Sequence, residues 1–138
     1  MIYKGIYSLL STNSDVTDIV GEKIFPVEVP EDIALPYIAY LLPDEEHLES
    51  LRGSSGSATV DCHVECYSAD FVECRNLKEA VRMSMQGFIG TAAGIQIKAT
   101  LMPKSPMGYI PPSDASEHVT YICVCQFRIT YVEEKPTF

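Results

Sequence analysis

Basic residues are scarce in this chain of 138 residues: ten lysines and arginines stand against 19 aspartates and glutamates, which gives a formal net charge of -9. Proteins that wrap a nucleic-acid backbone neutralise its phosphates with clustered lysine and arginine. The ten basic residues of this chain are scattered along its length. The composition therefore excludes a nucleic-acid binder of that kind, although DNA could slide past such a surface without specific binding.

Long apolar runs are also missing. No segment approaches the roughly 20 apolar residues that cross a membrane. The first ten residues, MIYKGIYSLL, lack the charged start, the long apolar core and the small-residue cleavage site of a secretory signal. We therefore expect a cytosolic protein with no membrane partner.

The cysteines do not form a disulfide framework, because five is an odd number and each lies inside a periodic segment. We predict five reduced thiols that pack as small hydrophobic side chains. A zinc site is the alternative reading of Cys62, His63, Cys66, Cys123 and Cys125. Strand side chains two residues apart are separated by roughly 6.6 Å, and the C-x-x-C turn that places two thiolates on one ion is absent. We expect no metal site, no cofactor and no catalytic residue.

Other patterns that suggest an enzyme are weak. The GSSGS segment at residues 53–57 lacks the final glycine of a nucleophile elbow and the lysine of a phosphate-binding loop. The period of a strand turns His63 away from its neighbouring cysteines. The carboxylates of residues 44–49 could hold a cation, but solvated carboxylates are the commoner case. A small thiol-dependent or metal-dependent enzyme stays open as an alternative, and its sign would be an accessible cysteine near a histidine.

Residues 58–88 organise the chain, because their hydrophobic period changes from two to about 3.6 in mid-course. The first half predicts a strand with one buried face, formed by Val60, Cys62, Val64 and Cys66. Ser68 is expected to cap the following helix, with Asp70 in its first turn. The apolar stripe of that helix is expected to pack on the sheet and consists of Phe71, Cys74, Leu77, Val81, Met85 and Phe88.

The other elements follow from similar patterns. We predict an N-terminal helix, a short helix over residues 14–20 that Gly21 ends, and a short edge strand at Ile24 and Phe25. Further strands are predicted at residues 37–42, 95–101 and 119–132, and Ile95, Ile97, Ala99 and Leu101 should share one face. The polar segment 43–57 and the proline-rich segment 102–117 are predicted as two long loops.

These elements define an α+β fold: a mixed, mainly antiparallel sheet of four or five strands with helices packed on one face. At 46% apolar residues the chain should form one domain over residues 1–138. Ile122 and Val124 interrupt the polar face of the last strand, which suggests that a helix or a neighbouring subunit covers that face. Few large apolar residues occur in the second loop, and the candidates for partner binding there are Met107, Tyr109 and Ile110.

The order of elements resembles the tail-terminator proteins of long-tailed bacteriophages, also described as tail-completion or head-tail joining proteins. The resemblance rests on DIVGEKIFP at residues 18–26, on the LPYI strand with Pro36 and Tyr37, and on VRMSMQGF at residues 81–88. It extends over nearly the whole chain, apart from the five cysteines and the long segment 102–117, which depart from a typical member.

The resemblance implies a structural virion protein rather than an enzyme. Six copies would form a homo-hexameric ring that caps the tail tube, stops its polymerisation and joins the tail to the head connector. The implied partners are further copies of the chain, the tail tube protein and the head-tail connector proteins, and assembly would take place in the host cytoplasm. Another neck ring, a connector or a stopper, is the alternative within the same class.

In such a ring the net negative charge of the chain would affect the passage of DNA. Six copies carry six times -9, or -54, and DNA must pass through the opening. We expect Ile122 and Val124 at the ring interface, and Glu45, Glu46 and Glu49 facing the lumen. Carboxylates on the lumen wall would keep phosphates from adhering to it.

Overall fold

The computed structural model describes residues 1–51, 53–111 and 119–136. Its three helices are α1 (Ile2–Ser11), α2 (Ser14–Val20) and α3 (Phe71–Met85). Its strands are β1 (Ile24–Pro26), β2 (Tyr37–Ser50), β3 (Gly53–Ser68), β4 (Gly90–Ala92), β5 (Ile95–Lys104), β6 (Met107–Ile110) and β7 (Thr120–Val132). None of the helices in these residues combines the length and the apolar character needed to cross a membrane.

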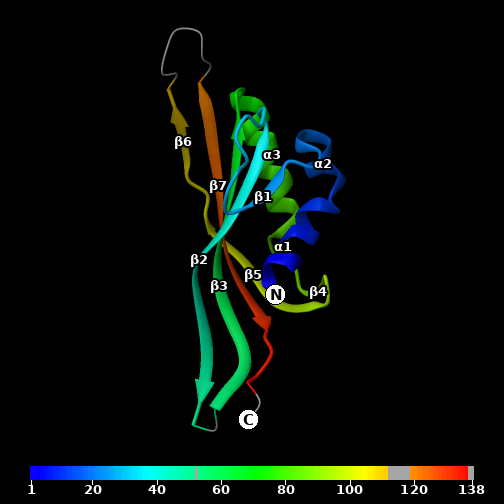
Figure 1. Cartoon of the computed structure of the whole chain (residues 1–138), viewed down its shortest axis with the longest axis vertical. Coiled ribbons are helices and arrows are strands. Elements are labelled where there is room, and N and C mark those ends of the chain that lie inside the picture. The colour runs from blue at the N-terminus through cyan, green and yellow to red at the C-terminus, as the bar shows by residue number, and fades with distance from the viewer. Residues whose placement is uncertain (52, 112–118, 137–138) are drawn as a thin grey trace.

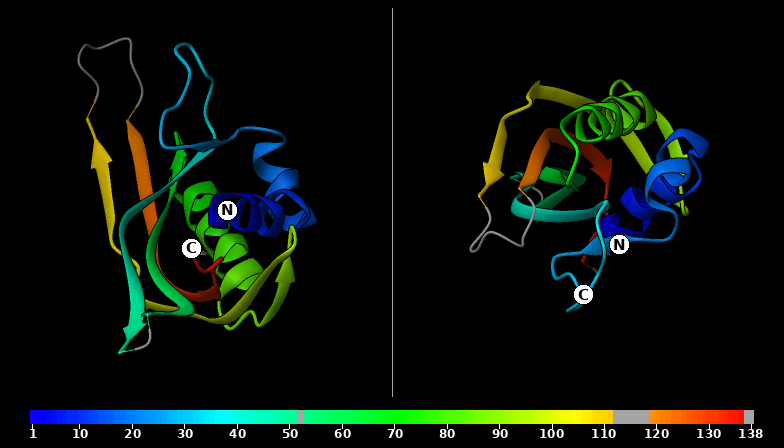
Figure 2. Two further views of the ribbon diagram at one scale, coloured as in Figure 1. Left: turned by 60° about the horizontal axis from the view of Figure 1, so that its bottom comes forward. Right: turned by 90° about the horizontal axis from the view of Figure 1, so that it is seen from above.

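The seven strands in the described part of the chain belong to one curled sheet, so the α+β class is confirmed but the predicted count of four or five strands is wrong. The order is β1-β2-β3-β7-β5-β4, and β6 pairs with β7. The pair of β1 and β2 is parallel, and the other pairs of the described strands are antiparallel. The three helices lie together on one side of this sheet (Figure 1), which curls strongly when seen from above (Figure 2).

Two of the described strands, β4 and β6, were not predicted from the sequence, and β2, β3 and β5 extend beyond their predicted ends. Residues 43–57, predicted as a loop, form the far half of a long β2–β3 hairpin, in which Asp44 pairs with Asp61 and Leu48 pairs with Ser57. A register shift between Leu41 and Asp44 falls at Pro43, which suits a bulge because proline has no N–H to donate. Polar side chains occupy both faces of this hairpin arm because no helix covers it, so the alternation that marks a half-buried strand is absent.

Residues 102–117, predicted as the second loop, are also partly strand. β5 continues to Lys104, and β6 pairs with residues 120–123 of β7, while β5 pairs with residues 126–131 of the same strand. The backbone N–H of Val124 donates to the carbonyl of Pro106 at 2.9 Å, so the prolines lie where the ladder needs no donor from them. Residues 112–117 of the predicted loop lie outside the described residues.

The centre of the core lies between α3 and the β3–β7 pair, as the change of period predicts, and buried residues of α1, α2, β1 and β2 extend it. Alternate residues of β3 from Val60 to Cys66 are buried, and so are alternate residues of β7 from Cys123 to Tyr131. On α3 the fully buried residues are Cys74, Leu77, Val81 and Met85. Phe71, the first member of the predicted stripe, is half exposed, and its ring packs edge-on against Tyr121 with the ring centroids 5.8 Å apart.

The cap of α3 lies two residues after its predicted position. The carboxylate of Asp70, rather than Ser68, caps α3 by accepting the backbone N–H of Glu73 at 2.9 Å. The buried hydroxyl of Ser68 accepts the N–H of Asp70 and donates to the Glu73 carboxylate. In α2 the side chain of Asn13 is the cap, and Gly21 ends the helix with a φ of 61°, as predicted.

β5 departs from its predicted alternation after Ile97. A register shift between Ile97 and Ala99 adds one residue to the strand, so Thr100 turns inward and Leu101 turns outward. The hydroxyl of Thr100 donates to the carbonyl of Phe88 at 3.1 Å, which satisfies it in the core. A polar residue therefore takes the buried place that the sequence pattern assigned to Leu101.

Candidate interaction surfaces

The face of the sheet that points away from α3 carries an aromatic row. Tyr37, Tyr67 and Ile122 lie opposite one another on β2, β3 and β7. The rings of Tyr37 and Tyr67 stack with their centroids 4.8 Å apart. Burial, with the neighbouring charge of Glu65, raises the pKa of Tyr67 to about 12.

Val124 continues this row on the same face of β7, opposite Glu65. We call Tyr37, Tyr67, Ile122 and Val124 the apolar outer patch; all four side chains are half-buried. On the β6 side Ile122 lies opposite Gly108, where an added side chain would meet no atom within 4 Å. Ile122 and Val124, the two residues predicted at a ring interface, therefore belong to one apolar surface, and the space beside it at Gly108 is not filled by other atoms of the chain. Their role in an interface stays a prediction.

The three residues predicted to bind a partner lie on β6 and are accessible. Met107 is 42% exposed, Tyr109 is 67% exposed and Ile110 is 53% exposed. Tyr109 lies opposite Tyr121 and Ile110 lies opposite Thr120, so their side chains point to different faces of the sheet. A partner that contacts all three side chains would therefore have to contact both faces of β6.

The three glutamates predicted to line a lumen do not share one surface. Glu45 lies opposite the buried Val60, and its carboxylate accepts a hydrogen bond from the hydroxyl of Tyr131. Glu46 lies on the other face, with Asp44, Thr59, Asp61 and Arg128 around a small hollow of about 170 Å³. Glu49 is exposed near the tip of the hairpin arm.

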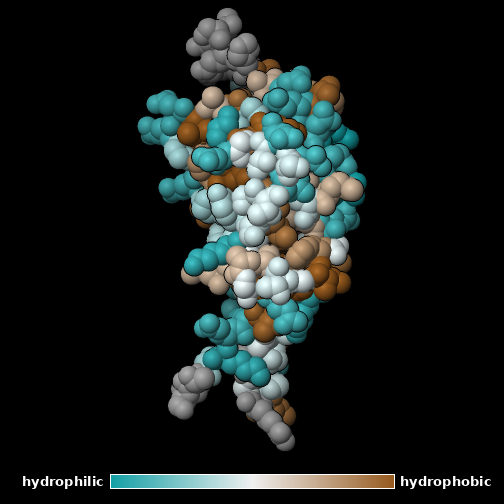
Figure 3. All heavy atoms as spheres, turned by 90° about the vertical axis from the view of Figure 1, so that its right-hand side faces the viewer, coloured by the Kyte–Doolittle hydropathy of each residue, from teal (hydrophilic) through white to brown (hydrophobic). Residues whose placement is uncertain are grey.

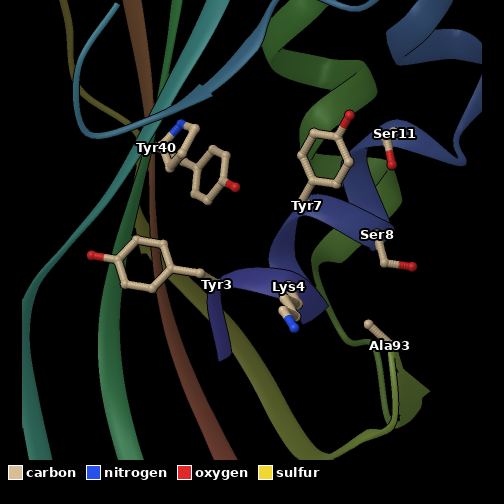
Figure 4. Close-up of a pocket in the computed structure, with 8 residues that line it drawn as sticks. Tyr3, Lys4, Tyr7, Ser8, Ser11, Tyr40 and Ala93 are labelled. Carbon is tan, nitrogen blue, oxygen red and sulfur yellow. The ribbon is translucent and has the colours of Figure 1, made fainter. Parts of the chain in front are cut away.

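A cavity beside α1 was not found from the sequence. It measures about 590 Å³, and its lining consists of Tyr3, Lys4, Tyr7, Ser8, Ser11, Pro26, Tyr40 and Ala93. Figure 4 shows the rings of Tyr3, Tyr7 and Tyr40 around its opening. The spacing of Tyr3 and Tyr7 by four residues on one helix was the only available signal, because Tyr40 comes from a strand far along the chain.

The helical side of the molecule has no apolar patch comparable to the apolar outer patch in the view of Figure 3. In Figure 3 its surface is a mosaic in which hydrophobic residues are interspersed among hydrophilic ones, and hydrophilic residues dominate the narrow arm. Single exposed hydrophobic side chains on such a surface are normal. The apolar outer patch and β6 therefore stand out as the surfaces best suited to contact another protein.

The thiols are poor candidates for chemistry. All five cysteines are free and buried, as predicted. Burial raises the pKa of Cys74 and of Cys125 to about 12, and it raises the pKa of Cys66 strongly. The thiolate is the reactive form, so these side chains are nearly inert at neutral pH. The accessible cysteine that a thiol-dependent enzyme requires is absent.

The fold occurs in a solved structure, the virion of a native gene transfer agent particle. A chain of that particle superposes with a TM-score of 0.75 over 93% of this chain and 92% of its own length, at 15% sequence identity. At that identity the likeness shows the fold alone. No curated protein sequence matches the chain.

The sequence model of one protein family matches residues 4–98, which is more than half of the chain. The fold of this chain and the family match together define a structural protein of the phage tail. The chain belongs to the family described as tail completion protein gp17. The matched residues include the DIVGEKIFP and LPYI segments, so the resemblance seen in the sequence is confirmed, while β6 and β7 lie outside the matched range.

Proposed function

We propose that copies of this chain form a closed ring that caps the tail tube, stops its polymerisation and joins the tail to the head connector. Family membership supports a role in tail completion. The apolar outer patch is the observation that carries the ring, because it is an apolar surface on the side of the sheet that the helices leave open. Six copies is the number that the resemblance implies.

The contact in such a ring is heterologous: the apolar outer patch of one copy meets a different surface of the next copy. The stacked rings of Tyr37 and Tyr67 are the two aromatic members of the patch. Ile122 and Val124 extend it along β7. Removing this area from water would favour assembly by about 25 cal/mol for each square ångström buried.

The sharpest test places one charge in the patch. Val124→Asp adds a carboxylate beside Glu65, and we expect it to lower the oligomer mass measured by native mass spectrometry and to leave tails overlong or headless in electron micrographs. Gln126→Asp is the matched control, because Gln126 lies two residues further along the same face, next to His63 and Lys104 and outside the patch. Equal oligomer mass for the two variants, with unchanged circular dichroism, would argue against this interface.

The place of the ring along the particle needs its own measurement. A terminator binds the end of assembled tail tubes, whereas a connector or stopper binds heads. Sedimentation of the purified chain with tail tubes, and separately with tailless heads, distinguishes these roles. We expect co-sedimentation with the tubes, and exclusive binding to heads would replace the proposed function with that of a connector or stopper.

A further inference from the structure

Three potential metal ligands converge where the hairpin arm meets the end of β7. Glu45 and His47 lie two residues apart on β2, which places both side chains on the same face. Glu133 directly follows β7, and its backbone N–H donates to the carbonyl of Gly56 at 2.9 Å. One ligand atom from each of the three side chains lies within 4.8 Å of the other two.

We propose that Glu45, His47 and Glu133 bind a divalent transition-metal ion of the zinc class. One imidazole nitrogen and two carboxylates are a donor set that suits zinc and its neighbours, whereas magnesium and calcium prefer oxygen ligands alone. Zinc bonds of about 2.1 Å at tetrahedral angles place ligand atoms roughly 3.4 Å apart. The three ligand atoms, which all lie within 4.8 Å of one another, would shift to reach that spacing.

The surroundings of the three side chains favour a cation. The Glu133 side chain is only 15% exposed, so its charge is partly removed from water. Within the described residues neither Glu45 nor Glu133 forms an ion pair with a lysine or arginine. The hydroxyl of Tyr131 donates to Glu45 and orients its carboxylate, as groups behind metal ligands commonly do.

Space for the remaining ligands lies beside the three donors. A cavity of about 710 Å³ is lined by Glu45, Tyr131, Glu133 and Glu134, together with residues of α1 and the β4–β5 turn. Water could occupy the open coordination positions there. Nδ1 of His47 lies 2.6 Å from a Glu133 oxygen, and a bound ion would replace that contact.

A bound ion would join segments that are far apart in the sequence. His47 and Glu133 are separated by 86 residues, and the metal would fasten the hairpin arm to the end of β7. This proposal differs from the expectation of no metal site, because the sequence shows the acidic arm but not the glutamate that folds against it. Metal binding by the single chain does not depend on ring formation, so the two proposals can fail separately.

The test is calorimetric titration of Zn²⁺ into the full chain after its treatment with a chelator. We expect one ion per chain for the wild type, and at least tenfold weaker binding for His47→Gln and for Glu133→Gln. Glu46→Gln is the control for a carboxylate on the opposite face of the same strand, and His63→Ala is the control for another histidine. Both controls should bind as the wild type does, and Mg²⁺ should give no saturable heat.

Thermal unfolding provides a second readout. Zn²⁺ should raise the unfolding midpoint of the wild type and of both controls but not that of His47→Gln, because an ion that binds only the folded state stabilises it. His47 is half exposed, so its replacement should leave the fold and the circular dichroism intact. Absence of saturable Zn²⁺ binding to the wild type, or equal affinity in wild type and His47→Gln, would overturn the site.

Discussion

At the scale of the residue, the five thiols behave as hydrophobic side chains because the sheet and α3 enclose them. The Sγ atom of Cys74 donates to the carbonyl of Cys66, and that of Cys125 donates to the carbonyl of Lys78. The period of two in the strands, and the apolar stripe of α3 for Cys74, were sufficient to predict their burial. It could not predict these contacts, because they depend on how α3 lies across β3 and β7.

We expect the thiols to react slowly with a disulfide reagent at pH 8 while the chain is folded. The pKa of Cys74 and of Cys125 is raised to about 12, so the thiolate population becomes substantial only as the pH approaches that value. In denaturant all five should react promptly. Absorbance of the released reagent measures both rates, and one prompt equivalent in the folded protein would show that a thiol is accessible.

Asp70 provides a second test at this scale. Asp70→Ala removes the side-chain acceptor for the N–H of Glu73, and we expect the free energy of unfolding to fall by about 1 kcal/mol. Asp70→Asn keeps an acceptor oxygen and should retain most of the stability. Urea denaturation measures all three proteins, and a loss as large in Asp70→Asn as in Asp70→Ala would contradict the role of Asp70 as the cap.

At the scale of the element, the sequence pattern predicts the helices and strands that pack on the core. It does not predict the strand segments that extend beyond the core. The β3–α3 unit and the N-terminal helices are correct because one face of each is buried, which imposes a period on the sequence. The far half of β2 and all of β6 have exposed side chains on both faces. Backbone pairing and polar side-chain contacts, such as that of the Ser55 hydroxyl with the carbonyl of Leu48, hold these segments as strands. Neither kind of contact produces a hydrophobic period in the sequence.

β6 is the element we expect to contact the tail tube or the connector. The triple variant Met107→Ala, Tyr109→Ala and Ile110→Ala removes its exposed apolar side chains, and we expect at least tenfold weaker binding to tail tubes in a sedimentation assay. Leu101→Ala is the control, because Leu101 is 59% exposed on β5. Undiminished binding by the triple variant, with the fold intact, would place the contact on another surface.

At the scale of the whole molecule, the excess of acidic residues should matter most where DNA passes. Because Glu45 binds Tyr131 on one face of β2, the variant that tests a lumen lining is Glu46→Lys with Glu49→Lys. We expect this variant to form rings and to slow DNA ejection, since lysines attract phosphates within a Debye length of roughly 8 Å. Ejection is followed by release of fluorescence from a dye that binds DNA. An unchanged ejection rate would mean that the arm faces away from the lumen.

The central claim is that the chain assembles into a closed ring through its apolar outer patch, and image averaging of the purified wild-type protein by cryo-electron microscopy tests it most directly. We predict closed rings in which Tyr37, Tyr67, Ile122 and Val124 lie at the contact between neighbouring copies. A chain that stays monomeric at high concentration, and also in the presence of tail tubes, would contradict the ring. Rings whose contacts leave these four residues exposed would contradict the interface.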